Sequence, residues 1–597
     1  MRLRHAATIS SSALVFVVAA VASACGDDDA PATTPSGEEA GTVDAGKEAA
    51  TLPLCQDGKP TSAYPPGPHE MSISSTLPQG LVFPGPDGDV AIDSFYEPCA
   101  EKSRILVVRS SAAWCGTCLW HLENDKKKVF DDPRFAGRLV FVDLVIGDED
   151  NMPATPDAAM RLRTKIDAPA GTKLGIDPAF TFGPAQLSKS PLPVYVFVDT
   201  KTMQILSTSS DPDPVTLSNK LLVELSILDK QPRPSVSNPT LIDSRFTENQ
   251  MDLIAAMKLP DNFAPPADPT NEYGDLPAAV TLGKKLFEDK ELTPTNTVSC
   301  ASCHDPAKEL TDGMPQSTGG LVRLDRNSPA IALASHSRWQ FWDGRVDSLW
   351  AQALGPFEDA KEMGSSRAFI VTQIKARYAS EYDAIFGVKH PIATASDTRI
   401  FVNVGKAIAA FERSLRVKPN PLDAYAGGDL DALTTPQKDA LLQFFKVGCA
   451  QCHWGPRLTD DAFHVIRFPT GRQDKQPDRG RFDVLPMLAA KEFNGTSQWS
   501  DAPQAAKPLA LPQADNMLGA FKTPTLRGIA VTTAPYSHGG MLDTLPLVTK
   551  HYGERGLKHD DPHAIGTTEQ WVPQFDGNVQ QQLPAILEVM TGEVVYP

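Results

Sequence analysis

The stretch VSCASCHDP, from Val298 to Pro306, contains two cysteines separated by two residues and followed directly by a histidine. The same spacing returns about 150 residues later, in GCAQCHWG. Two thiols at this spacing can add to the two vinyl groups of one porphyrin, and the adjacent histidine can reach its iron as the proximal ligand. The sequence therefore predicts two covalently bound c-type haems, held by Cys300, Cys303, Cys449 and Cys452, with His304 and His453 as axial ligands.

A zinc site and structural disulfides are the alternatives for these four cysteines. Structural zinc needs four ligands in paired Cys-x-x-Cys spacing, whereas these two pairs are about 150 residues apart in the chain. A disulfide between cysteines only three positions apart is strained. Haem attachment is therefore the favoured interpretation.

A third cysteine pair, in the stretch WCGTC from Trp114 to Cys118, has no histidine after it. It follows the buried-strand pattern ILVVRSS and opens a helix-like stretch, and a helix N-terminus lowers the pKa of a thiol placed there. The segment from about residue 70 to 229 resembles secreted thioredoxin-like oxidoreductases and redoxins. That resemblance implies redox-active thiols at Cys115 and Cys118 and a cis-proline at Pro193. An inert disulfide on the same fold is the alternative.

The N-terminus has the pattern of an export signal. The charged MRLRH precedes an unbroken apolar run, Ala13 to Ala22, which is too short to span a bilayer. The small residues before Cys25 resemble a bacterial lipoprotein processing site, although Ala22 stands where such sites usually carry leucine. We expect a periplasmic or cell-envelope protein that touches the membrane only through a lipid on Cys25. Plain secretion with cleavage near Ala24 is the alternative.

Composition separates the remaining segments. Residues 26–51 contain almost no large apolar side chains and predict a disordered acidic tether. The remaining predicted parts are an α/β thioredoxin-like domain (52–229), a Pro/Ser-rich linker (230–274) and two mainly α-helical cytochrome c-type domains (275–425 and 426–597). In an exported protein, the leftover Cys55 and Cys99 suggest a disulfide. The net charge of −17 disfavours nucleic acid as a partner.

Several motifs surround the haem sequences in a fixed order. LGKKLFEDKEL precedes the first, and RNSP, QFWDGRVDSLWAQALGPFEDAKEMG, DRGRF and FKTPTLRGIAVTTAPYSHGGMLDTLPLVTKHYGERG follow. Over about residues 275–597 they resemble the bacterial dihaem cytochrome c peroxidase/MauG family. The resemblance implies that the haem of His304 reacts with hydrogen peroxide, that Glu362 moves a proton between the peroxide oxygens, and that Gln352 orients the peroxide. It also implies that Trp342 relays electrons between the two haems.

The same resemblance implies a calcium ion between the two haem domains. Its ligands would be Asn327 in RNSP, and Thr533 and Pro535 in TTAP. An amide oxygen and two backbone carbonyls, completed by water, are ligands that suit a hard cation.

Two positions depart from the usual peroxidase pattern. Between His304 and His336 the chain has no histidine, so we expect the first haem to be five-coordinate and open without reductive activation. Tyr552, in KHYGERG, stands where the peroxidases carry the methionine ligand of the second haem. A phenolate ligand stabilises oxidised iron. His551 or Met541 is the alternative ligand.

Three functions follow as hypotheses. The first is an exported peroxidase that receives electrons from a small cytochrome or cupredoxin. The second is a MauG-like enzyme that uses peroxide to oxidise side chains of a specific protein partner. The third is a haem and thiol relay that only transfers electrons, which would leave the acid–base pair Gln352 and Glu362 without a purpose.

Overall fold

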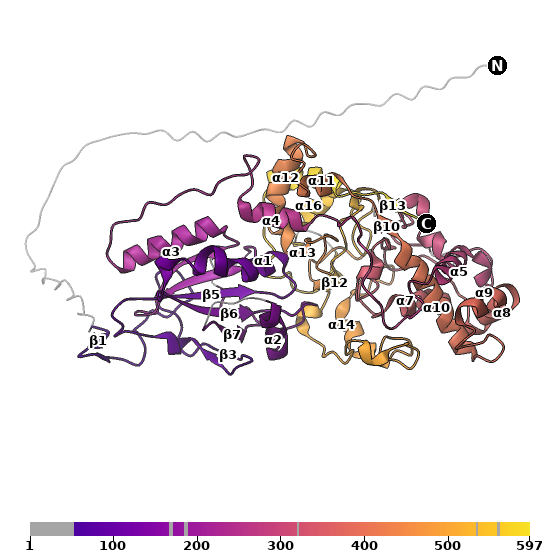
Figure 1. Cartoon of the computed structure of the whole chain (residues 1–597), viewed down its shortest axis with the longest axis horizontal. Coiled ribbons are helices and arrows are strands. Elements are labelled where there is room, and N and C mark those ends of the chain that lie inside the picture. Colours follow the sequence, from indigo (N-terminus) through magenta and orange to yellow (C-terminus); the bar gives the residue numbers. More distant parts are fainter. Residues whose placement is uncertain (1–52, 166–170, 184–188, 319–321, 533–534, 558–560) are drawn as a thin grey trace, which may run out of the picture. The chain divides into compact units, whose positions relative to one another are not determined.

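The computed structural model describes residues 53–165, 171–183, 189–318, 322–532, 535–557 and 561–597. The predicted signal peptide, Cys25, the tether and Thr533 lie outside these residues. An N-terminal part built on a mixed sheet is followed by a mainly helical part, as the sequence predicts (Figure 1). We call residues 53–229 the dithiol region, 275–425 the first haem region and 426–597 the second haem region.

The dithiol region is built on one five-stranded sheet, in the order β7-β6-β5-β8-β9. Its strands are β5 (Ile105–Ser111), β6 (Leu139–Val145), β7 (Lys173–Ile176), β8 (Val194–Asp199) and β9 (Ile205–Ser210). The first three strands pair in parallel, and β8 and β9 continue the sheet antiparallel. The central strand β5 is buried along its whole length, which explains its continuous apolar start.

Helices and short hairpins cover the two faces of this sheet. Helix α3 (Pro214–Leu228) packs on the face that carries Val107 and Phe197. The pair β3 (Val82–Phe83) and β4 (Val90–Ala91) packs on the opposite face, and α3 and β3 lie on opposite sides of the sheet in Figure 1. Helices α1 (Gly116–Asp125) and α2 (Pro156–Lys165) complete the region, and the short pair β1 (Cys55–Gln56) and β2 (Lys59–Pro60) begins it. The expected disulfide between Cys55 and Cys99 is present.

The first haem region packs its helices around one long helix, α10 (Asp397–Ser414). Its other helices are α5 (Pro277–Glu288), α6 (Cys300–Cys303), α7 (Leu349–Glu358), α8 (Arg367–Arg377) and α9 (Ala379–Phe386). Helix α10 crosses α5 and α7 at glycines: a Cβ on Gly283 would lie 1.9 Å from the carbonyl oxygen of Ala407, and one on Gly405 would lie 2.5 Å from that of Trp350. These close crossings place α6 and α7, which carry the predicted site residues, on a common core.

The second haem region has shorter helices and one two-stranded pair. Its helices are α12 (Thr435–Lys446), α13 (Cys449–Cys452), α14 (Arg481–Val484), α15 (Ile529–Thr532), α16 (Leu545–Gly553), α17 (Gly577–Gln582) and α18 (Pro584–Val589). Helix α11 (Pro421–Ala426), at the end of the first haem region, packs in the same core. Strands β11 (Phe463–His464) and β12 (Phe521–Lys522) pair antiparallel. That pairing brings His464 and Lys522 close to the haem motifs.

Two segments differ from the predicted boundaries. Within the predicted linker, residues Glu248–Ala256 form α4, whose capping box is made by Thr247 and Gln250. Helix α4 buries Leu253 in the core of the second haem region, so this part of the linker is a packed element. At the other end of the chain, β13 (Val594–Val595) pairs with β10 (Arg416–Val417) and returns the C-terminus to the first haem region.

Among the described residues, no helix combines the length and the apolar composition that crossing a bilayer requires.

Candidate functional site

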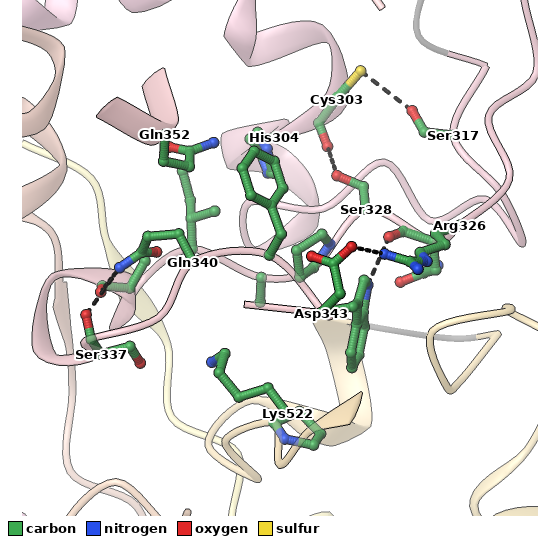
Figure 2. Close-up of a pocket in the computed structure, with 18 of the residues that line it drawn as sticks. Cys303, His304, Ser317, Arg326, Ser328, Ser337, Gln340, Asp343, Gln352 and Lys522 are labelled. Carbon is green, nitrogen blue, oxygen red and sulfur yellow. Dashed lines mark hydrogen bonds and ion pairs between the residues drawn. The ribbon is translucent and has the colours of Figure 1, made fainter. Parts of the chain in front are cut away.

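The first candidate site is a cavity of about 440 Å³ beside α6. Its wall includes the predicted residues Cys303, His304, Trp342, Gln352 and Glu362. A hollow of about 50 Å³ next to it shares four of them, all except Trp342, and adds Cys300. Figure 2 shows Cys303, His304 and Gln352 along one side of the cavity and Lys522 on the opposite side. The structure thus brings together residues that are 60 positions apart in the sequence.

Both motif histidines are held in one orientation by the backbone. His304 Nδ1 lies 3.1 Å from the carbonyl oxygen of Leu310, and His453 Nδ1 lies 3.0 Å from that of Leu458. Because a carbonyl can only accept, Nδ1 carries the proton and Nε2 has its lone pair available for a metal. Burial lowers the pKa of both imidazoles, which favours the neutral, ligating form.

The donor chemistry of both sites fits a covalently bound haem. All four motif cysteines are thiols, and each pair spans one short helix, α6 or α13. A second cavity lies beside α13, and its wall contains Trp571 Nε1 and His538 Nε2. Both atoms are buried without a hydrogen-bond partner in the described part of the chain. An unpaired indole N–H and an unpaired imidazole nitrogen match the polar edge of a porphyrin.

Glu362 and Gln352 approach the first cavity from one helix and the turn after it. Gln352 lies on α7, and Glu362 follows the end of that helix by four residues. Burial raises the pKa of the Glu362 carboxyl above its ordinary value, and the nearby positive charge of Arg345 partly opposes the shift. A carboxyl whose pKa is raised in this way holds a proton more readily than an ordinary glutamate, which suits a group that must both take up and release one.

A second carboxyl, Glu412, reaches the same cavity and is absent from the predicted site. It lies on α10 and lines both the larger cavity and the small hollow. The residue is buried in the protein. Its Oε2 has no hydrogen-bond partner in the described part of the chain, and burial raises its pKa to about 8. A signal exists in the sequence: Glu412 follows Phe411 and falls among the apolar positions of a strongly amphipathic helix.

Trp342 belongs to both cavities. It lines the first cavity and also a second cavity of about 180 Å³ beside α13. Its backbone oxygen accepts from the Lys522 amide at 2.8 Å, and its Nε1 donates to the backbone oxygen of Asn327 at 2.9 Å. The indole is therefore fixed between the two candidate haem sites by bonds to both haem regions.

Asn327 and Pro535, two of the three predicted calcium ligands, lie against each other. Asn327 Nδ2 is 3.5 Å from the Pro535 carbonyl oxygen and 2.7 Å from that of Met314, while Oδ1 is buried and without a partner among the described residues. The two ends of a side-chain amide have the same shape, so the amide can present oxygen where nitrogen now faces these carbonyls. Thr533 lies outside the described residues.

The second cavity distinguishes the three residues considered as its distal ligand. Tyr552 lines it together with Cys449, Cys452 and His453. His551 instead lies 2.9 Å through Nε2 from the carbonyl oxygen of Ile466 and stacks on Phe468. Met541 is exposed and forms no part of the wall. Burial, and then the neighbouring motif cysteines, raise the pKa of the Tyr552 hydroxyl.

The third cysteine pair forms a disulfide at the start of α1. Cys115 caps the helix, accepting from the Cys118 amide at 3.2 Å, and is bonded to Cys118. The Leu192–Pro193 peptide bond is cis and leads into β8. Thr117, which replaces the proline usual in such motifs, donates to the Leu192 carbonyl oxygen at 2.9 Å. The geometry joins the dithiol and the predicted cis-proline in one site.

Comparison with protein families and curated proteins agrees on the C-terminal half. Residues 277–431 match the family model described as di-haem cytochrome c peroxidase. The methylamine utilization protein MauG of Methylorubrum extorquens is 36% identical over 287 residues, which cover 47% of this chain and 70% of MauG. The cytochrome-c peroxidase IdrP2 of Denitromonas iodatirespirans is 31% identical, over 55% of this chain and 87% of that protein. The cytochrome c551 peroxidase of Pseudomonas aeruginosa is 34% identical, over 44% and 67%.

Two solved structures match separate parts of the chain. A MauG-like protein associated with microbial copper homeostasis covers 56% of this chain and 95% of its own, with 27% identity and a TM-score of 0.44. A putative thiol:disulfide interchange protein DsbE from Chlorobium tepidum covers 26% of this chain and 98% of its own, with 16% identity and a TM-score of 0.21.

The relatives confirm the family that the motifs predict, and the family implies two c-type haems. With 36% identity over 70% of MauG, and a family-model match that contains the first haem motif, the chain belongs to the dihaem cytochrome c peroxidase/MauG family and is an oxidoreductase of the peroxidase type.

Proposed function

We propose that the protein is an exported peroxidase that reduces hydrogen peroxide at the site of His304, with electrons from a small redox protein such as a cytochrome c or a cupredoxin. The observation that carries this proposal is the position of Glu362 and Gln352 in the wall of the cavity that His304 lines. A pure electron carrier needs no acid–base residues at its haem, whereas a peroxidase does.

Each residue of the site has a separate role in the reduction of peroxide. The haem, when bound, supplies the redox chemistry. The Glu362 carboxylate takes a proton from the near oxygen of peroxide and returns it to the far oxygen, which then leaves as water. The Gln352 amide donates a hydrogen bond that orients the peroxide. Trp342 provides an aromatic contact common to both sites, through which the second site can share the oxidation. In total, peroxide takes up two electrons and two protons and yields two waters.

The first site is also proposed to be open in its oxidised state. Among the described residues that line its cavity and the adjoining hollow, His304 is the one histidine. A protein ligand on the far side of the iron would therefore have to come from a side chain of another type.

The decisive experiment adds peroxide to the oxidised, two-haem protein and records optical and electron paramagnetic resonance spectra. We expect an immediate spectral change, followed by rapid oxidation of added reduced cytochrome c. The absence of any spectral change in the oxidised protein would refute the open site.

A MauG-like oxidation of a protein partner is the second candidate, and Tyr552 is the observation that favours it. Its position in the wall of the second cavity suits a phenolate ligand, which stabilises oxidised over reduced iron. A long-lived oxidised species that ignores cytochrome c in the experiment above would favour this function over peroxide removal.

We also propose that calcium binds where Asn327 meets Pro535, with Thr533 as a third ligand. The buried, unpaired Asn327 Oδ1 supports this assignment. Metal analysis of the purified protein should give about one calcium per chain, and Asn327→Ala should lose it. Full calcium content in Asn327→Ala would place the ion elsewhere. A cell-envelope location with a lipid on Cys25 completes the proposal, and mass spectrometry of the mature N-terminus tests it.

A further inference from the structure

The disulfide of the dithiol region is sealed by the second haem region. Cys115 and Cys118 are both fully buried. A Cβ placed on Gly116, between them, would lie 2.6 Å from the ring of Trp454, the residue that follows His453. A dithiol that serves other proteins must present its attacking sulfur to solvent, whereas this pair faces the second haem motif.

A hydrogen bond and close packing join the cis-proline loop of the dithiol region to the second haem motif. The Leu192 amide, next to Pro193, donates at 2.8 Å to Oε1 of Gln451, which lies inside the second haem motif. Gly448, at the start of that motif, approaches so closely that a Cβ would lie 3.0 Å from Pro191. The loop that bears the cis-proline is thus bonded directly to α13.

Aromatic side chains fill the space between the disulfide and the second cavity. The ring centroid of Trp114 lies 4.6 Å from the ring centroid of His464 and 5.9 Å from that of Trp571. His464 and Trp571 both line the second cavity, and His464 Nε2 is 3.7 Å from Cys452 Sγ. Cys452 itself packs against the cluster that contains both disulfide cysteines.

Charged partners fix His464 at this junction. Its Nδ1 lies 2.8 Å from Glu569 and its Nε2 lies 3.0 Å from Asp460, while Asn151 of the dithiol region donates to the Phe463 carbonyl and to Glu569. The contact between the two regions therefore consists of specific bonds to the wall of a haem site, in addition to apolar packing.

We infer that Cys115 and Cys118, when reduced, are an internal two-electron donor to the peroxidase. The two thiols release two electrons and two protons and form their disulfide. The electrons pass by way of the contacts of Trp114 and Trp571 to the second site and replace those that peroxide has withdrawn. Peroxide takes up two protons as its O–O bond breaks, so the balance is one dithiol and one peroxide to one disulfide and two waters. A small dithiol then restores the thiols by exchange, which requires the contact with Trp454 to open.

The number of electrons stored and required supports electron transfer from the dithiol to peroxide. One dithiol stores two electrons, one peroxide needs two, and each haem site can pass on one of them. The inference rests on the proposed peroxidase function, and the test therefore measures the thiols and the haems separately.

The test uses the full-length protein with both haems. The disulfide is reduced with a phosphine, the reductant is removed under argon, and one equivalent of peroxide is added to the oxidised haems. Samples are quenched in acid and denatured, and remaining thiols are alkylated with a maleimide, so that mass spectrometry counts the thiols at positions 115 and 118. We expect both thiols to be lost together at one peroxide per dithiol, at least tenfold faster than in Glu362→Gln.

A matched pair of variants tests the route. Trp114→Leu removes the ring between the disulfide and His464 and should slow thiol loss at least fivefold. Trp499→Leu, which replaces a tryptophan that packs on Phe493 in another part of the molecule, should behave as wild type. If Trp114→Leu fails to bind haem, the comparison with Glu362→Gln still decides the question.

Each other outcome overturns the inference in a recognisable way. Thiol loss at the same rate in Glu362→Gln would mean that peroxide attacks the sulfurs directly. A normal haem reaction and normal oxidation of cytochrome c, with both thiols retained, would refute the internal donor and leave the peroxidase function intact. No haem reaction at all would refute the function itself. A disulfide that cannot be reduced in the native protein would exclude it as a donor that can be reloaded.

Discussion

Glu362 has the two properties that an acid–base residue needs in a peroxidase. It faces the cavity of His304, and burial raises its pKa. Glu362→Gln keeps the shape and removes the proton acceptor, so we expect kcat/KM for peroxide to fall by about 10²- to 10⁴-fold. The control is Glu358→Gln at the end of α7, four residues before Glu362. Its exposed carboxylate pairs with Arg367, and the variant should retain full activity.

The pH dependence follows from the sign of that shift. The ionised carboxylate is the base, and it is lost as pH falls through the raised pKa. We therefore expect the acidic limb of kcat/KM to lie at a higher pH than an ordinary glutamate would give, and to be absent from the residual activity of Glu362→Gln. An unchanged limb in the variant would assign it to another group, for which Glu412 is the nearest candidate.

Tyr552 and His551 are neighbours in the sequence that face different surroundings. We expect Tyr552→Phe to change the spectra of the second haem and to raise its reduction potential, because a phenolate stabilises the oxidised iron. His551→Gln, at a side chain that is buried against Phe468 and the Ile466 carbonyl, should leave both unchanged. The reverse pattern in a spectroelectrochemical titration would identify His551 as the ligand.

At the scale of elements, the crossing of α5 and α10 is the most sensitive contact of the first haem region. Gly283→Ala would drive a methyl group into the Ala407 carbonyl, so we expect a loss of about 1–3 kcal/mol of unfolding free energy. Gly355→Ala on α7 meets nothing within 4 Å and should be neutral or stabilise by up to about 1 kcal/mol. Denaturant unfolding of both variants checks the prediction, and equal stabilities would contradict the packing.

The elements also show which features a sequence reveals. The alternation that predicted an α/β part holds for β5, β6 and β8, because their apolar runs are set by burial within one sheet. The packed helix α4 was hidden in a Pro- and Ser-rich stretch, because its burial depends on a partner surface more than 150 residues away. Strand β13 is two residues long and carries no periodic pattern.

Some residues of the candidate sites could be predicted from the sequence, and others required the structure. The Cys-x-x-Cys-His spacing predicted the cysteines and histidines, because haem attachment requires fixed local spacing. Gln352 and Glu362 were predicted from the family resemblance, and the structure places both in the wall of the cavity that His304 lines. Glu412 and Trp454 were not predicted: each is a single residue whose position depends on how distant elements pack. The choice between Tyr552 and His551 also required the structure, since adjacent residues on a helix point in different directions.

At the scale of the whole molecule, Trp454 is the cover of the disulfide. Trp454→Ala should expose that face, so reduced Cys115 and Cys118 should react with a maleimide several times faster than in wild type under native conditions. Trp499→Ala is the control, because it removes an equally large ring that packs against the core of the first haem region instead. Equal alkylation rates in the two variants would show that Trp454 does not control access to the pair.

The contact between the dithiol region and the second haem motif also implies an order for the assembly of the protein. Cys452 packs against the cluster of the dithiol region, and Gln451 is bonded to Leu192, so the docked molecule leaves an attachment enzyme no approach to this motif from that side. The N-terminal region is synthesised first and can fold early. We expect its docking to follow the attachment of the second porphyrin, so that this contact forms late in the assembly of the chain.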